Sequence, residues 1–187
     1  YHLVQLKERY GGLEMPDIIV DDMRVERKRK TVNGSFGSLL LDSIKSTLED
    51  KKQVILFQNR RGFAPRVECG VCHWIPQCVN CDVSMTYHKA QNILKCHYCG
   101  FTMSVPSQCP SCNSTDLKMQ GLGTERVEEE MQAILPEADI ARLDLDTTRS
   151  KNSYMNILDK FRRHETNVLV CTQMVSKGLD FDCVKTV

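Results

Sequence analysis

The sequence is poor in the features that mark membrane proteins and highly charged proteins. Its 187 residues contain no apolar run approaching the roughly eighteen residues of a transmembrane helix, and Tyr1 opens no signal-peptide pattern. Neither sign of charge is in excess, since 25 Lys and Arg residues face 24 Asp and Glu residues, a formal net charge of +1. A purely electrostatic grip of the whole chain on nucleic acid is thereby excluded, and any such contact must be local. We expect a cytoplasmic protein with no membrane partner.

The sequence also lacks the motifs with which a chain hydrolyses a nucleoside triphosphate by itself. There is no G-x-x-x-x-G-K-[ST] phosphate loop and no Asp-Glu magnesium motif, and the glycine-rich stretch GLGTE at 121–125 has no lysine. The chain opens on Tyr1 and stops at Val187 inside the apolar run CVKTV. These observations favour a fragment of a longer protein, and we expect this fragment alone to be inactive.

Cysteine is the residue that the sequence has in unusual number. Eight of its ten cysteines fall between 69 and 112 as four CxxC pairs, and the long charged flanks add only Cys171 and Cys183. A CxxC turn is poor disulfide geometry but presents two sulfurs to one metal, and Zn²⁺ binds four thiolates in a tetrahedron. The pattern therefore favours a cytosolic module with two zinc sites over a disulfide framework.

Two pairings of the four CxxC turns are open. The middle pairs have the spacing C-x2-C-x14-C-x2-C, close to that of zinc ribbons, which leaves the outer pairs to share the other ion. In a sequential pairing the chain would have to reverse direction within HWIPQ at 73–77, which is a short segment for such a turn. The nested arrangement is therefore favoured. Its ligand sets are Cys69, Cys72, Cys109 and Cys112 for one zinc, and Cys78, Cys81, Cys96 and Cys99 for the other.

The segment that holds these pairs has too few large apolar side chains to build much of a core. Structural zinc contributes about 10–16 kcal/mol per site in peptides, so the metal is expected to hold the module together. The module has four aromatic residues: Trp74, Tyr87, Tyr98 and Phe101. They can stack on unpaired bases or pack in the small core, and packing in the core is favoured for each of them. Three histidines are expected not to bind metal: His73, His88 and His97. Of these, only His97, next to Cys96, is placed to hydrogen-bond a zinc-bound sulfur.

Outside this module the pattern is that of an α/β domain. The predicted helices, with Ser38, Thr124 and Ser150 as their caps, lie at 37–52, 123–135 and 150–164. The predicted strands lie at 16–26, 53–59, 138–144, 167–173 and 183–187. Helices alternating with short apolar strands indicate a parallel sheet, which the metal module interrupts.

Several motifs occur in a specific order: RRGFAP, four CxxC pairs, GLGTE, RLDLDTT and TQMVSKG. In this the sequence resembles the family of replication-restart DNA helicases, the primosomal N′ or PriA proteins, from just past helicase motif III to motif V. The resemblance covers nearly the whole chain and is weakest over 1–50. It implies the second RecA-like lobe of a superfamily 2 helicase, truncated, with an inserted two-zinc module. The implied parts are 1–65 (linker and first part of the lobe), 66–118 (zinc module) and 119–187 (remainder of the lobe).

The resemblance also assigns roles to single residues. VILFQNRRG is similar to motif IV and TQMVSKGLDF to motif V, where a buried strand ends in a polar loop of the kind that holds ligands in parallel sheets. Two residues are implied to face ATP, namely Gly178 and Asp180. Five are implied to contact DNA, namely Arg60, Arg61, Thr172, Gln173 and Lys177, the last of which can serve either ligand. Leu179 stands where many members of the family are expected to carry His.

The activity implied is that of an ATP-dependent 3′→5′ DNA helicase that restarts stalled forks and assembles the primosome. ATP and Mg²⁺ in the full-length protein, and two Zn²⁺ ions, are the implied cofactors. Forked or single-stranded DNA, primosome proteins and single-stranded DNA-binding protein are the implied partners. The alternative is a non-catalytic zinc-ribbon platform that binds DNA or protein. A zinc chaperone is disfavoured, because no pair extends to CxxCxGxG.

Overall fold

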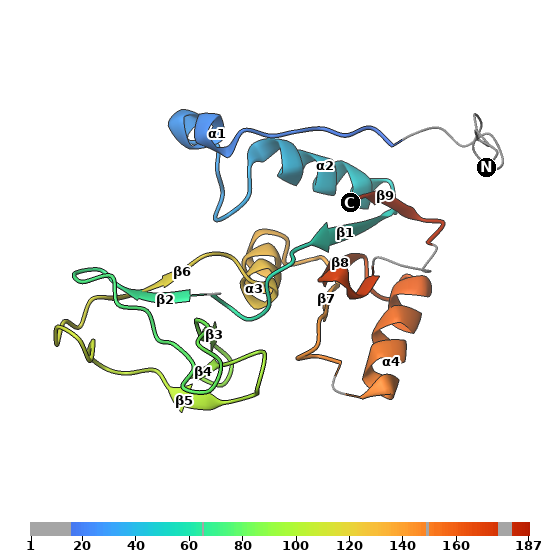
Figure 1. Ribbon diagram of the computed structural model, residues 1–187. Helices are drawn as coiled ribbons and strands as arrows, with labels where there is room; N and C mark the ends of the chain where they lie inside the picture. Colours follow the sequence, from blue (N-terminus) through green and yellow to red (C-terminus); the bar gives the residue numbers. More distant parts are fainter. Residues whose placement is uncertain (1–15, 65, 149, 176–180) are drawn as a thin grey trace, which may run out of the picture.

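The chain folds into two parts in the computed structural model, which describes residues 16–64, 66–148, 150–175 and 181–187. One part is an α/β lobe, and the other is a Cys-rich module inserted between a strand and a helix of that lobe (Figure 1). The lobe is built on a four-stranded parallel sheet of order β7-β8-β1-β9. Its strands are β1 (Gln53–Phe57), β7 (Ile140–Leu143), β8 (Val168–Cys171) and β9 (Val184–Thr186). Its helices on the sheet are α2 (Ser38–Glu49), α3 (Thr124–Ile134) and α4 (Lys151–Arg162).

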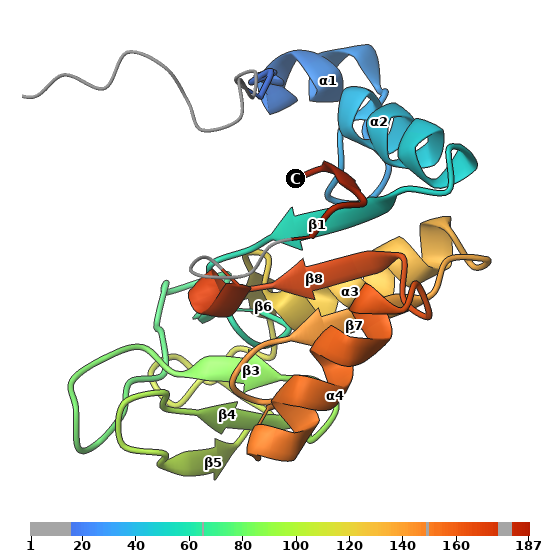
Figure 2. The same ribbon diagram turned by 90° about the vertical axis from the view of Figure 1, so that its right-hand side faces the viewer.

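Helices cover both faces of the sheet, which explains why its central strands β1 and β8 are apolar except for Gln53 at the start of β1. Successive side chains of a strand point to opposite faces. Val54 and Leu56 of β1 join the core beneath α2 and α3, whereas Ile55 joins the core beneath α4. β8 alternates in the same way, and Figure 2 shows α4 in front of the sheet with α3 behind it. The predicted parallel α/β architecture is confirmed.

The apolar run at 16–26 does not form the strand that the sequence predicts. Its first half is irregular, and α1 (Met23–Arg29) follows with the Asp22 carboxylate as its N-cap. Glu26, which is buried, holds the helix against the start of α2 because its carboxylate accepts hydrogen bonds from the backbone N–H and the hydroxyl of Ser38, at 2.9 and 2.8 Å. A local cap and a buried carboxylate therefore override the β-branched residues of this run.

The helices are short, and two of them begin differently from the prediction. Ser150 caps α4 as predicted, its Oγ accepting a hydrogen bond from the Ser153 N–H at 3.1 Å. Ser38 and Thr124 are instead the first residues of their helices, and their hydroxyls bind carboxylates elsewhere in the lobe. Among the described residues no helix is long and apolar enough to cross a membrane.

The Cys-rich module consists of short antiparallel strands. They are β2 (Arg66–Cys69) with β6 (Leu117–Gln120), and β3 (Thr86–His88), β4 (Ile93–Lys95) and β5 (Thr102–Ser104). The core they enclose is small and centres on Met85 and Leu94. Because β2 and β6 pair antiparallel, the two connections between module and lobe lie side by side (Figure 1).

The aromatic residues of the module do not all behave alike. Tyr87 is buried in the module core and Phe101 packs against it, as predicted. Trp74 is half-buried. Tyr98 is 83% exposed, so the packing predicted for this side chain is wrong.

The two connections are hydrogen-bonded to each other at the start of α3. The Thr124 N–H donates to the Arg60 carbonyl at 2.8 Å, and the Glu125 N–H donates to the Gly62 carbonyl at 3.1 Å. An added Cβ at Gly123 would collide with the Gly62 carbonyl, so glycine is required here for close backbone approach. Gly123 of GLGTE therefore serves the junction of module and lobe, and the first N–H groups of α3 are already satisfied by protein.

Candidate metal centres and the adjoining sheet edge

The eight clustered cysteines gather into two groups of four. The first cluster comprises Cys69, Cys72, Cys109 and Cys112, and the second cluster comprises Cys78, Cys81, Cys96 and Cys99. Within each group the sulfur atoms lie within 4.8 Å of one another. The structure thus brings the thiols together in the nested arrangement, with the outer CxxC pairs sharing one group and the middle pairs the other.

The spacing of the sulfurs fits zinc. A tetrahedral ion with metal–sulfur bonds of about 2.3 Å places its sulfurs about 3.8 Å apart. The closest pairs measure 3.6 Å between Cys69 and Cys112, 3.5 Å between Cys72 and Cys109, and 3.5 Å between Cys78 and Cys99. Sulfurs this close, none of them joined in a disulfide, are arranged for a shared cation.

All four CxxC pairs are built on one backbone pattern, which we call the knuckle. The residue after the second cysteine has positive φ, and its N–H donates to the carbonyl of the first cysteine. The next residue accepts a hydrogen bond from the N–H of that first cysteine. The positive-φ residues are His73, Asp82, Gly100 and Asn113. Three of these are Asp, Asn or Gly, the types that favour this conformation, so the sequence carries the knuckle signal next to three of the four pairs.

Backbone N–H groups of the knuckles also point at the sulfurs. N–H groups of Cys72 and Val71 lower the pKa of Cys69 to about 6, and the Phe101 N–H lowers the pKa of Cys99 to about 6. In the second cluster the neighbouring Cys99 raises the pKa of Cys81 to about 12. Four thiolates are thus not stable together without a cation, which is the condition that zinc meets.

The carboxyl edge of the parallel sheet holds Thr172 and Gln173, two of the residues expected to contact DNA. Thr172 directly follows β8 and is buried, and its N–H donates to the Leu143 carbonyl of β7 at 3.3 Å. Gln173 is exposed and opens the short 3₁₀ turn Gln173–Val175.

The arginines of RRGF lie at the same edge, beyond the end of β1. Arg60 is exposed and Arg61 is half-buried. The remaining predicted site residues, Lys177, Gly178 and Asp180, lie outside the described residues.

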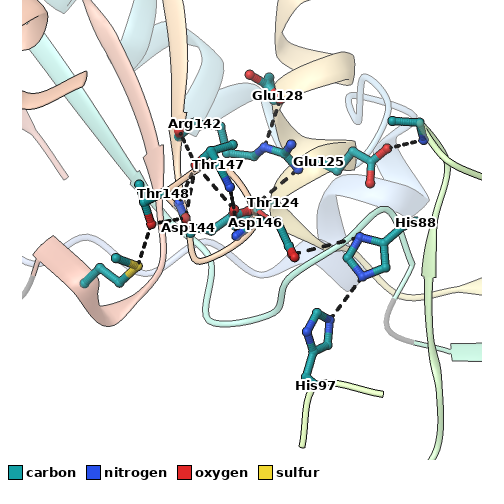
Figure 3. Close-up of polar contacts among 12 residues, drawn as sticks. His88, His97, Thr124, Glu125, Glu128, Arg142, Asp144, Asp146, Thr147 and Thr148 are labelled. Carbon is teal, nitrogen blue, oxygen red and sulfur yellow. Dashed lines mark hydrogen bonds and ion pairs between the residues drawn. The ribbon is translucent and has the colours of Figure 1, made fainter. Parts of the chain in front are cut away.

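A loop that sequence reasoning missed adjoins this edge. Asp144 follows β7 and is fully buried, and its carboxylate accepts hydrogen bonds from the Thr124 hydroxyl at 2.6 Å and from the N–H groups of Asp146 and Thr147 at 2.9 and 3.0 Å (Figure 3). Asp144 therefore fixes both the start of α3 and the loop 144–148. The available signal was an acidic residue directly after a predicted strand, in DLDTT.

The same loop touches the module. Lys95 donates to Asp146 Oδ1 at 3.2 Å, and His88 Nδ1 lies 3.9 Å from Asp146 Oδ2. The other ring nitrogen of His88, Nε2, lies 3.2 Å from Nε2 of His97 (Figure 3). Burial lowers the pKa of both imidazoles, to about 4 for His97, so both are neutral at pH 7. The expectation that these histidines are bystanders is therefore incomplete, because His88 lies against Asp146 of the lobe and His97 contacts His88.

Comparison with known families finds two matches. Residues 78–103 match the PriA DNA helicase Cys-rich region domain, and residues 112–187 match the helicase conserved C-terminal domain. The first match contains the whole second cluster, and the second contains α3, the loop 144–148 and the sheet edge at Thr172.

Individual relatives match over the full chain. The replication restart protein PriA of Bacillus subtilis is 41% identical over 187 residues, 100% of this chain and 23% of the relative. PriA of Haemophilus influenzae is 38% identical over 186 residues (100% and 25%), and PriA of Synechocystis is 41% identical over 184 residues (96% and 22%). The chain thus spans about a quarter of the length of these curated relatives. It belongs to the family of PriA replication restart proteins, of which it corresponds to the segment with the Cys-rich region and helicase C-terminal domain.

Proposed function

We propose that this chain is part of an ATP-dependent 3′→5′ DNA helicase of superfamily 2 that restarts stalled replication forks and assembles the primosome in the bacterial cytoplasm. In this proposal residues 1–65 and 119–187 contribute to the second RecA-like lobe, and 66–118 form its zinc module. ATP and Mg²⁺ bind between this lobe and parts of the protein outside the chain. Forked or single-stranded DNA, primosome proteins and single-stranded DNA-binding protein are the partners.

One observation carries the proposal: the module is fastened at the edge of the sheet where a motor lobe binds its ligands. Its connections leave the lobe after β1 and return before α3, and they are bound to each other by the Arg60–Thr124 and Gly62–Glu125 backbone hydrogen bonds. A module so fixed moves with the lobe. It thereby carries motion produced in an ATP cycle to whatever the module touches.

The roles of single residues follow from this placement. Thr172 and Gln173 lie where the parallel strands end, and we assign them, with Arg60, Arg61 and Lys177, to the DNA. Gly178 and Asp180 are assigned to ATP by the motif V resemblance. Zinc at the two clusters supplies folding free energy to a module whose own core is small, and the eight cysteines are its proposed ligands.

The module also offers a contact surface, which favours its use as a platform in addition. Three apolar side chains lie between the cysteines of three knuckles and are strongly exposed: Val71 (64%), Val79 (76%) and Tyr98 (83%). Apolar and aromatic side chains held at rigid turns suit stacking on unpaired bases or contact with a partner protein. We propose that these knuckle tips meet fork DNA or a primosome protein.

The test is an unwinding assay with the full-length protein on fluorescent forks that carry either a 3′ or a 5′ single-stranded tail. ATP-dependent strand separation that requires the 3′ tail is expected. The matched control replaces ATP by a non-hydrolysable analogue and should leave the forks intact. Tight binding of the forks without separation in the presence of ATP would instead identify a platform and overturn the helicase proposal.

A further inference from the structure

A third group of metal-ligating side chains lies at the junction of module and lobe. His88 and His97 come from the module, His88 as the last residue of β3 and His97 from the turn after β4, and Asp146 comes from the loop after β7 in the lobe. We call these three residues the junction cluster. One ring nitrogen of each histidine and one carboxylate oxygen of Asp146 lie within 4.8 Å of one another (Figure 3).

From this geometry we propose that the junction cluster binds a divalent transition-metal ion of the zinc class, in addition to the ions of the two cysteine clusters, and so links module and lobe. Two imidazoles and one carboxylate are a ligand set that Zn²⁺ and its neighbours in the first transition row accept, with water as a further ligand. The ligand atoms differ from the thiolates of the first and second clusters, so this site is chemically distinct from both.

The distance between the two facing histidine nitrogens matches the distance expected between two ligands of one such ion. Metal–nitrogen bonds of about 2.0–2.1 Å in a tetrahedron place two nitrogens about 3.3 Å apart. Nε2 of His88 lies 3.2 Å from Nε2 of His97. The carboxylate lies on the other side of the His88 ring, with 3.9 Å between Asp146 Oδ2 and His88 Nδ1, so the His88 ring or the Asp146 side chain has to reorient before one ion can bind all three residues.

The carboxylate oxygen is available for this movement. Asp146 Oδ1 accepts the hydrogen bond from Lys95, whereas Oδ2 is buried and has no hydrogen-bond partner. A buried unsatisfied carboxylate oxygen is unfavourable, and a metal bond relieves it. Burial also favours the site, because the side chains of His88 and Asp146 are 8% and 16% exposed.

A path for the ion and for a water ligand is present. A pocket of about 310 Å³ opens onto His88 and Asp146, and Glu125 and Arg142 also line it. The carboxylate of Glu125 is held beside the cluster by the Ala90 N–H at 2.8 Å, and it adds negative charge where a cation enters. The pocket thus gives access to two of the three ligands, His88 and Asp146, and its lining carries both the Glu125 carboxylate and the opposing charge of Arg142.

Such an ion would be the strongest tie between the two parts at this junction. The polar contacts here include the half-buried pair of Lys95 and Asp146, 3.2 Å apart, and the exposed pair of Lys89 and Glu129, 2.5 Å apart, and exposed ion pairs contribute little to stability. A metal bound by residues of both parts would fix the module against α3 and the loop 144–148.

The test is calorimetric titration of Zn²⁺ into the full-length protein after a mild chelator has left only the two tightly bound ions. One further site per chain is expected. Asp146→Asn, on the lobe side, and His97→Asn, on the module side, should each weaken it by a factor of ten or more. His164→Asn is the matched control, because His164 is exposed with φ of 61°, which asparagine tolerates, and it should bind as wild type does.

Cobalt(II) provides a second readout that does not depend on any variant. A third equivalent of cobalt bound by nitrogen and oxygen should add ligand-field absorption without more thiolate charge transfer. A total of two metals per wild-type chain under these conditions overturns the proposal and leaves a purely hydrogen-bonded junction. The proposal is equally overturned if Asp146→Asn and His97→Asn each still hold the two tightly bound ions and bind the third ion with the affinity of wild type.

Discussion

The buried carboxylate of Asp144 offers the sharpest test of how the sheet edge is held. It is 0% exposed and accepts hydrogen bonds from Thr124, Asp146 and Thr147, and Arg142 Nη1 lies 3.6 Å from it. Asp144→Ala removes all of these acceptors at once, leaves the buried Thr124 hydroxyl without its acceptor, and leaves Arg142 with Glu128 as its remaining ion-pair partner. Breaking one side of a buried charged network typically costs about 3–5 kcal/mol. We therefore expect a loss of about that size in the free energy of unfolding.

A milder change at the same position separates charge from shape. Asp144→Asn keeps one oxygen that can accept from the loop N–H groups but loses the charge, so a loss of about 1–2 kcal/mol is expected. Asp159→Ala is the matched control, because Asp159 is a half-exposed carboxylate on α4 whose contact with Arg162 is 3.5 Å long, and its removal should change stability by less than about 0.5 kcal/mol.

The assay is urea unfolding of the zinc-saturated chain, followed by circular dichroism and by hydrogen exchange of the loop 144–148. Loss of protection should be largest in this loop and at the first turn of α3, which Asp144 joins. If Asp144→Ala unfolds within 1 kcal/mol of wild type, the network does not hold the edge and the reasoning is refuted.

Three further predictions concern the metal, the motif V residues and the core. A strong chelator should remove two zinc ions per chain from the cysteine clusters and unfold the module, since structural zinc contributes about 10–16 kcal/mol per site; a well-folded module with fewer than two ions by metal analysis would contradict this. In the full-length protein Asp180→Ala should lower the DNA-stimulated ATPase rate, whereas Thr172→Ala should mainly raise the DNA concentration needed for stimulation; unchanged ATPase in the Asp180 variant would count against the motif V assignment. Phe161→Ala should destabilise the lobe by about 3–5 kcal/mol, because its ring is fully buried and meets Phe181 edge-to-face at 5.1 Å, and a loss below 1 kcal/mol in thermal unfolding would show a looser core than described.

Much of the fold was accessible from the sequence because its signals are local. The apolar runs of β1 and β8 predict strands buried on both faces, and these strands form the centre of the sheet. The nested grouping of the cysteines follows the spacing between pairs. The knuckle residues Asp82, Gly100 and Asn113 carry their own conformational preference.

The rest depends on contacts between distant residues. The run at 16–26 has strand propensity, but the buried Glu26 and its bonds to Ser38 determine the outcome. The pairing of Thr124 with Asp144 and the meeting of His88 with Asp146 join residues 20 and 58 positions apart, and no periodicity encodes them. The motif V loop at 176–180 lies outside the described residues, so the roles assigned to it stay predictions.

The central claim is that the module is a working part of a helicase and not a brace for its motor. It is tested most directly by parallel measurements of DNA-dependent ATPase and fork unwinding on the full-length protein with Cys78→Ser and Cys81→Ser. Both residues belong to the second cluster, and Cys183→Ser, outside both clusters, is the control. The variant should lose one zinc and unfold its module locally, keep most of its ATPase, and fail to separate strands. If ATPase and unwinding fall together, the module only supports the structure of the motor. If unwinding is undiminished, the module has no part in it. Either result contradicts the claim.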